Sequence, residues 1–417
     1  MKHKALNPLL FSIAAVLLLF QNCSGKFEAI NQVAELSTGS GGSSLLEGEI
    51  VPNGIAPNLV PNCLANPNYN TCVFWKNPIA QEGRVFASPV GGSSDLRSLQ
   101  THAVNIQPEH LDNSGFLQNS SLRVNAQLAD GTILPRVDAR TRVFKFAYGS
   151  DPAHKFSQIM AFYWLNFQID FMQKHTGNFY AKNKNILVVS YYPERPEAFW
   201  FYGGDQKFIF MGSNNAGNEL ALSAEVYLHE MGHANLGYAT NFTHYETSSA
   251  QSKSQICADR ENTCCKSPLG CASAIDEGQA DYHFAIIFPQ NTAVLETFGN
   301  SVDGISECGI TRTVSKNSGL TLQGAYDSCG NSARGEIHLM GRVYASIWWE
   351  VRRQAALVNL GDIKTLDTMF TEHLKLISST DDFSSMLTKI KAIDASLFNS
   401  KFSALFEIEF ARRGITQ

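Results

Sequence analysis

One short stretch constrains this chain more than any other, because residues 229–233 read His-Glu-Met-Gly-His. Side chains four positions apart lie on the same face of an α-helix, so both imidazoles can reach one ion. Glu230 lies between the two histidines, and its carboxylate would sit close to the same ion. This HExxH pattern is typical of helices that bind zinc. It predicts a helix from about residue 219 to residue 235, with Gly237 as its C-cap.

Length and charge limit the remaining possibilities. The chain has 417 residues, which is enough for a large core and for two or three domains. Its 44% hydrophobic and 17% charged residues are ordinary for a globular protein. The formal net charge of -5 gives no reason to expect a nucleic-acid partner. No feature of the pattern indicates an oligomeric state.

The N-terminus has the composition of an export signal. Basic side chains at residues 2 and 4 precede a nearly unbroken apolar run over residues 9–20. The run is too short for a stable membrane span, so residues 1–22 are predicted to be a signal peptide. We therefore expect an exported protein.

Cys23 follows the apolar run directly and resembles the lipidated cysteine of a bacterial lipobox. Phe20 and Asn22 depart from the usual leucine and small residue of that pattern. The prediction is a lipid anchor at Cys23 that holds the protein on a membrane of the cell envelope. The alternative is cleavage near Cys23 without lipidation, which would give a periplasmic or secreted protein.

The cysteine count agrees with export. Nine cysteines are an odd number, and lipidation of Cys23 would leave eight. These eight fall into three clusters, with two pairs flanking a group of four: Cys63 and Cys72, then Cys257, Cys264, Cys265 and Cys271, then Cys308 and Cys329. Disulfides within clusters suit an oxidising compartment, although the group of four allows three connectivities. A structural zinc in that group is disfavoured because paired CxxC spacing is absent.

Composition divides the rest of the chain into three parts. Residues 23–60 are rich in Ser and Gly and are predicted to be a flexible tether. Residues 61–148 alternate apolar and polar positions at 122–128 and 142–146, which favours a small β-rich module. The final part, residues 150–417, is expected to hold the HExxH helix.

Within this final part the pattern predicts a buried helix over residues 153–174 and strands over 186–191 and 207–211. A cysteine-bearing loop is expected over residues 240–272. In the remainder of the chain, to residue 417, the spacing of apolar residues predicts mostly helices.

Two carboxylates downstream can complete a metal site. Glu277 and Asp281 are four residues apart, so one helix face can present both. One could ligate the ion while the other accepts a hydrogen bond from a ligand imidazole. The alternative is a solvated acidic helix face. Apolar residues surround the pair, which favours a buried helix whose acidic groups need partners.

The combined motifs resemble those of the thermolysin-like, glutamate-zinc metallopeptidases, and Glu-Gly-x-Ala-Asp at 277–281 is most similar to the fungalysin branch. The resemblance covers roughly residues 150–417. Further similar segments follow in the family's order: Ala198-Phe199-Trp200 with the strand at 208–210, Ile337-His338-Leu339-Met340-Gly341 with Trp348-Trp349-Glu350, and Phe410-Ala411-Arg412-Arg413-Gly414.

The resemblance implies an α+β fold with two lobes. The N-terminal lobe would mix strands and helices, the C-terminal lobe would be mainly helical, and the β-rich module would precede them. His229, His233 and Glu277 would bind Zn²⁺. Glu230 would be the general base, and Asp281 would orient His229.

The resemblance also assigns residues beyond the zinc ligands. His338 would donate a hydrogen bond to the oxyanion of the tetrahedral intermediate. Glu197 and Ala198 would contact the substrate backbone at the cleft edge, although Glu197 replaces the family's asparagine. A tyrosine that assists the oxyanion in the family has two candidates, Tyr238 and Tyr245. The longer interval between His233 and Glu277 carries the four-cysteine loop.

We therefore expect an exported, lipid-anchored zinc endopeptidase that hydrolyses peptide bonds in peptide or protein substrates through a zinc-activated water. An envelope lipoprotein that uses the same fold as a non-catalytic binding module is one alternative. A zinc hydrolase acting on a non-peptide amide is another, and Glu197 leaves room for it.

Overall fold

The computed structural model describes eleven parts of the chain, with gaps between them: residues 63–74, 101–148, 151–193, 198–203, 206–212, 220–240, 265–287, 314, 320–328, 334–357 and 363–415. Several predictions lie outside these residues, namely the signal peptide, the tether, Cys23, Glu197, Tyr245 and the cysteines at 257, 264, 308 and 329. The described part mixes helices with two small sheets, which confirms the α+β class.

The larger sheet has four strands in the order β3 (Leu122–Asn125), β4 (Ile186–Tyr192), β6 (Gln206–Gly212) and β5 (Ala198–Gly203). β3 and β6 both pair with β4 in parallel, whereas β5 pairs antiparallel with β6 and forms the edge. The two strands predicted over 186–191 and 207–211 are confirmed.

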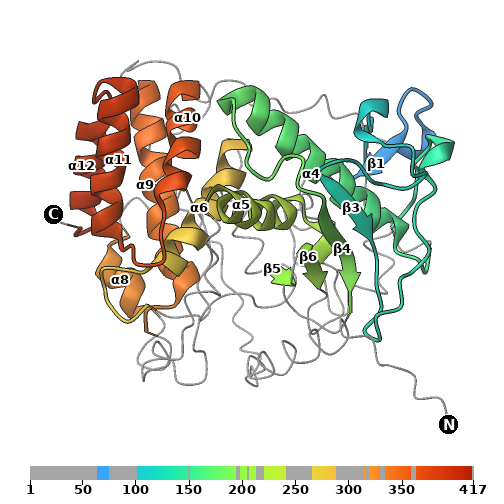
Figure 1. The fold of residues 1–417 in the computed structure, drawn as a ribbon, viewed down its shortest axis with the longest axis horizontal. Coiled ribbons are helices and arrows are strands. Elements are labelled where there is room, and N and C mark those ends of the chain that lie inside the picture. Colours follow the sequence, from blue (N-terminus) through green and yellow to red (C-terminus); the bar gives the residue numbers. More distant parts are fainter. Residues whose placement is uncertain are drawn as a thin grey trace, which may run out of the picture.

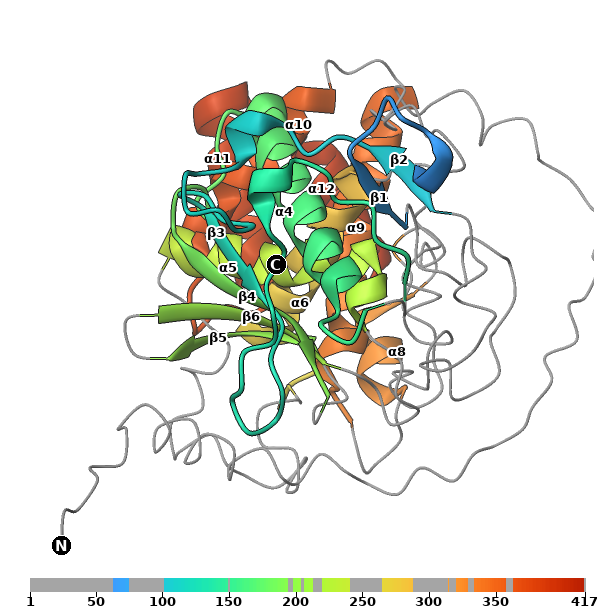
Figure 2. The same cartoon turned by 90° about the vertical axis from the view of Figure 1, so that its right-hand side faces the viewer.

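One cross-strand row explains which face of this sheet is covered. Val124, Val188, Ile209 and Trp200 are register partners across the four strands, and all four side chains are buried. Successive side chains of a strand point to opposite faces, so this row belongs to one face. Helices α4 (Lys155–Thr176) and α5 (Ala224–Thr240) contact the strands, and Figure 2 shows both on one side of the sheet.

The C-terminal part of the described chain is helical, as its period predicted. It contains α9 (Ile337–Leu357), α10 (Ile363–His373), α11 (Phe383–Phe398) and α12 (Ser403–Arg412), preceded by the short α8 (Leu322–Asp327). Figure 1 shows α9 to α12 side by side at one end of the molecule, with α5 and α6 between them and the sheet. The central α6 (Ala272–Ile287) packs against both α5 and α9.

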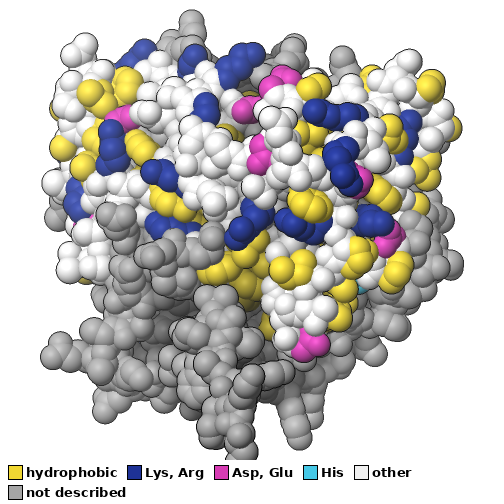
Figure 3. Space-filling view, turned by 45° about the vertical axis from the view of Figure 1, so that its right-hand side comes forward, with side chains coloured by type: hydrophobic (Ala, Val, Ile, Leu, Met, Phe, Trp, Pro, Cys, Tyr) yellow, Lys and Arg dark blue, Asp and Glu magenta, His cyan; other side chains and the backbone are white. Residues whose placement is uncertain are grey.

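A fully buried carboxylate ties four of these helices together. Asp367 on α10 accepts hydrogen bonds from Nε of Arg352 at 3.0 Å and from the Tyr282 hydroxyl at 3.3 Å. The Nε2 atom of His175 lies 2.7 Å from the same carboxylate. Burial alone would raise the pKa of Asp367, but Arg352 and His175 hold it below its usual value. Asp367 and its partners Arg352 and Tyr282 are in the interior. At the surface, on the face in Figure 3, Lys and Arg side chains are spread among apolar and uncharged groups.

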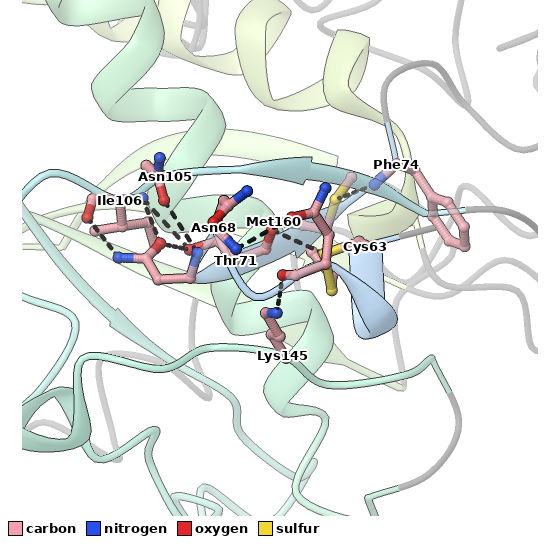
Figure 4. The surroundings of a disulfide bond; sticks show 11 residues. Cys63, Asn68, Thr71, Phe74, Asn105, Ile106, Lys145 and Met160 are labelled. Atoms are coloured by element: carbon pink, nitrogen blue, oxygen red, sulfur yellow. Dashed lines mark hydrogen bonds between the residues drawn. A yellow bond between two sulfur atoms is a disulfide. The ribbon is translucent and has the colours of Figure 1, made fainter. Parts of the chain in front are cut away.

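Residues before α4 join the same core. Strands β1 (Thr71–Val73) and β2 (His102–Val104) pair antiparallel beside the Cys63–Cys72 disulfide. The Phe74 amide donates to Sδ of Met160 on α4, as Figure 4 shows. The predicted division near residue 148 crosses the larger sheet, because β3 precedes it and β4 follows it.

The alternating segment 142–146, which favoured a β-rich module, forms no regular strand. Arg142 takes a positive φ of 55° and ends the short 3-10 turn Ala139–Thr141, which interrupts the extended run. A single bridge remains, between Phe144 and Thr71.

In the described residues no helix is both long enough and apolar enough to cross a membrane.

Candidate metal centre

The helix that carries the HExxH motif is confirmed, with shifted ends. α5 begins at Ala224 rather than near residue 219 and runs to Thr240, so Gly237 lies inside the helix instead of capping it. An internal glycine costs about 1 kcal/mol relative to alanine. The contacts of the next residue offset that cost, because the Tyr238 ring packs on Trp200 and lies under Nζ of Lys207, 3.8 Å from the ring centroid.

Three side chains from α5 and α6 converge at one point. The Nε2 atoms of His229 and His233 are 3.0 Å apart. The carboxylate of Glu277 lies 3.4 Å from Nε2 of His229 and 3.7 Å from Nε2 of His233. One ligand atom from each of these buried residues lies within 4.8 Å of the others, so the group could hold a metal ion.

Each ligand imidazole has a carboxylate behind it. Oδ1 of Asp281 lies 2.8 Å from Nδ1 of His229, which is the partner predicted for Asp281. Oδ1 of Asp276 lies 2.7 Å from Nδ1 of His233. Sequence reasoning missed Asp276, although a third carboxylate next to Glu277 in an otherwise apolar segment was a usable signal.

These contacts fix the protonation of both rings. An ionised carboxylate can only accept a hydrogen bond, so Nδ1 of His233 carries the proton, and the close contact with Asp281 favours a proton on Nδ1 of His229 as well. In the neutral rings both Nε2 atoms then present lone pairs toward each other and toward the Glu277 carboxylate. Three electron-pair donors that face one point repel unless a cation lies between them. The arrangement therefore favours a bound cation.

Without metal, a proton takes part of that role. Burial lowers the pKa of His233, but the charges of Asp276 and Glu277 outweigh it and raise the pKa to about 9. Glu230 contributes in the same direction and is itself buried in α5. The cluster therefore has an electrostatic preference for positive charge.

Small residues allow the ligand helices to approach closely. A Cβ atom built on Gly232 would lie 2.7 Å from Cα of Ala280, and one on Gly278 would lie 2.4 Å from the carbonyl oxygen of Gly341. Real Cβ contacts are not that short, so α6 fits between α5 and α9 because these positions lack side chains. All 16 residues of α6 are buried, so the alternative of a solvated acidic face is wrong.

His338 reaches the centre from the first turn of α9. Its Nε2 atom lies 3.4 Å from Oε1 of Glu277, and its Nδ1 atom lies 2.6 Å from Oε1 of Glu336. The side chain is partly exposed, whereas Glu336 is buried. The structure thus brings His338 to the ligand group, and it adds Glu336, which sequence reasoning missed.

Two other predicted site residues, Ala198 and Tyr238, make their contacts elsewhere in the structure. Ala198 begins the edge strand β5, as predicted, and is partly buried. The Tyr238 hydroxyl donates to the carbonyl of Lys184 at 3.4 Å, in the segment before β4.

The described cysteines form local disulfides, as predicted. Cys63 pairs with Cys72, and Cys265 pairs with Cys271 just before α6. The second bond uses two of the four clustered cysteines, so these two cannot be zinc ligands.

No known family model matches this chain, and no curated protein matches it.

Proposed function

We propose that this protein is a zinc-dependent endopeptidase with a thermolysin-like, two-lobed fold. The observation that carries the proposal is the convergence of His229, His233 and Glu277, with Glu230 on the same helix as the histidines. Two imidazoles and one carboxylate are a donor set that suits catalytic zinc, which keeps a further position open for water or substrate.

The distances fit that ion. Ligand atoms about 2.0–2.2 Å from a tetrahedral zinc lie about 3.2–3.6 Å from one another. The two Nε2 atoms here are 3.0 Å apart, and different oxygens of Glu277 approach them, Oε2 at 3.4 Å from His229 and Oε1 at 3.7 Å from His233, so the three side chains lie close to these separations. Zinc at this position would polarise a carbonyl and lower the pKa of a water molecule.

The residues around the ligands would have distinct catalytic and positioning roles. Glu230 takes a proton from the attacking water and passes it to the leaving amine. His338 donates from Nε2 to the oxygen that becomes negative, while Glu336 behind its Nδ1 stabilises the charged imidazole. Asp281 and Asp276 keep the ligand rings in place.

Two further features support a peptide as substrate. Strand β5 is the edge of the larger sheet, and an edge strand offers unpaired backbone groups to an extended chain. Ala198 begins this strand. The helices α9 to α12 lie at one end of the molecule, with α5 and α6 between them and the sheet (Figure 1), an order that is compatible with a helical lobe beside a mixed one.

We also propose export and a lipid anchor at Cys23. The support is the apolar N-terminal run, the Ser- and Gly-rich tether over 23–60, and two disulfides that suit an oxidising compartment. A tether of this composition would let the folded part stand away from a membrane.

The test is a paired assay on purified protein. Wild type should bind about one zinc per chain by mass spectrometry of the native protein and should cleave unfolded casein. The Glu230→Gln variant should keep the zinc and lose cleavage by about a hundred- to ten-thousandfold, because it keeps the shape and removes the base. Chelation should abolish cleavage, and added zinc should restore it. If wild type binds zinc but leaves casein and a peptide library intact, the non-catalytic binding module is favoured instead.

A further inference from the structure

The disulfide-closed loop from Cys265 to Cys271 lies directly before α6. The backbone amide of Ile275, in the first turn of α6, donates to the carbonyl of Cys271 at 3.1 Å. Cys265 is almost completely buried. The loop is therefore part of the packed structure and continues into the helix that carries Glu277.

The same loop is bonded to the segment before α9. The amide of Cys265 donates to the carbonyl of Gly335 at 2.6 Å, and the amide of Gly335 donates to the carbonyl of Tyr326 at 2.7 Å. The Tyr326 hydroxyl returns to the loop and donates to the carbonyl of Lys266 at 3.3 Å. These hydrogen bonds close a ring of contacts that fixes Gly335 on the loop.

Gly335 is the point of closest approach between the two segments. Its φ of 78° lies in the left-handed region that favours glycine. A Cβ atom at this position would lie 2.2 Å from the carbonyl oxygen of Cys265. Any side chain here would push the segment away from the loop.

Glu336 follows Gly335 and fixes His338. Its Oε1 atom lies 2.6 Å from Nδ1 of His338, and its Oε2 atom accepts from the amide of Leu339 at 2.9 Å. One buried carboxylate thus caps the start of α9 and orients the histidine ring. The opposite nitrogen of that ring lies 3.4 Å from Glu277.

We propose that the loop 265–271 is a positioning element for His338. It holds Gly335, and through it Glu336, so that Nε2 of His338 faces the metal centre. The ligand rings have separate supports in Asp276 and Asp281. Opening the Cys265–Cys271 disulfide should therefore displace His338 while metal binding persists. The catalytic consequence rests on the proposed peptidase function, whereas the displacement itself does not.

The test compares zinc-loaded wild type with the Cys265→Ser/Cys271→Ser double variant. Zinc affinity is measured by competition with a chromophoric chelator. The Nδ1–H signal of His338 is followed by NMR in protein labelled with ¹⁵N-histidine, after assignment with His338→Gln. We expect a zinc Kd within about threefold of wild type, loss of the His338 signal, and kcat/KM lower by about ten- to a hundredfold with KM unchanged.

Two further variants make the result decisive. Gly335→Ala keeps both cysteines and should displace His338 in the same way, so it decides the matter if the double variant does not fold. Cys63→Ser/Cys72→Ser removes the other described disulfide and should leave the His338 signal and kcat/KM unchanged.

Opposite results overturn the inference in a recognisable way. If the His338 signal and kcat/KM survive both loop variants, the loop does not position His338. If the Cys63/Cys72 control reduces both readouts equally, the effect is general destabilisation. If wild type cleaves no substrate, the peptidase proposal fails, while the NMR comparison still decides whether the loop holds His338.

Discussion

Replacing Asp276 by asparagine is expected to weaken metal binding while leaving the fold intact. The two side chains have nearly the same shape, and the asparagine oxygen can still accept from Nδ1 of His233. What is lost is a full negative charge that lies 2.7 Å behind a ligand imidazole. The variant therefore separates the effect of charge from the effect of shape.

The magnitude follows from the charge preference of the site. The pKa of His233 is raised from 6.5 to about 9, so the site favours a positive charge. Asp276 is the largest of the groups that raise it. Loss of an outer carboxylate of this kind typically weakens metal affinity by about ten- to a hundredfold, or about 1.4–2.8 kcal/mol. We therefore expect a zinc Kd higher by a factor in that range.

The assay is chelator competition at constant pH, with circular dichroism to confirm the fold. Asp170→Asn is the matched control, because Asp170 lies 2.6 Å from His110 but is 57% exposed, so its charge acts through solvent. The control should leave the Kd unchanged. If Asp276→Asn binds zinc within threefold of wild type, the carboxylate behind His233 does not tighten the site and the reasoning is refuted.

Three further predictions concern the packing around the site. Arg352→Ala leaves the buried Asp367 without its main counter-charge, so urea unfolding should show a loss of about 3–5 kcal/mol; a loss below about 1 kcal/mol would contradict the network. Burial lowers the pKa of His283 from 6.5 to about 4, so the unfolded chain takes up its proton first. Stability should then fall by about 3 kcal/mol as the pH drops from 6.5 to 4, and His283→Gln should lack this part of the decline. Gly278→Ala places a Cβ 2.4 Å from the carbonyl of Gly341 and should cost about 1–3 kcal/mol, measured by thermal unfolding, together with weaker zinc binding.

The ligand residues could be predicted because their spacing is a property of one helix at a time. His229 and His233 lie one turn apart on α5, and Glu277 and Asp281 lie one turn apart on α6. A periodicity of 3.6 residues places each pair on one face whatever the rest of the chain does. The buried setting of α6 was also predictable from its apolar flanking residues.

Asp276 was not predicted because its partner lies on another helix, and Glu336 was not predicted because its contact with His338, two residues away, depends on how the chain turns before α9. Asp276 reaches His233 only because α6 crosses α5 with Ala280 against Gly232. Glu336 reaches His338 because the chain turns at Gly335, where the φ is positive. No local pattern reports where two helices cross.

The ends of elements were also decided by tertiary contacts. Gly237 favours a helix end locally, yet α5 continues to Thr240 because Tyr238 packs on Trp200 and under Lys207. The local cost of a glycine inside a helix is of the order of 1 kcal/mol. The buried area of the Tyr238–Trp200 pair, together with about 0.5–1.5 kcal/mol from the aromatic contact itself, outweighs that cost.

The sequence by itself determined the α+β class, the helices that carry the metal-binding residues, and the residues that local periodicity puts on a common face. Only the tertiary structure decided that these faces meet, since this depends on side-chain volumes where α6 passes between α5 and α9. Gly232, Gly278 and Gly341 have no side chain at the points where the helices touch. The helix axes can therefore come close enough for imidazole and carboxylate atoms to converge on one ion. Periodicity fixes direction along a helix, whereas packing fixes the distance between helices.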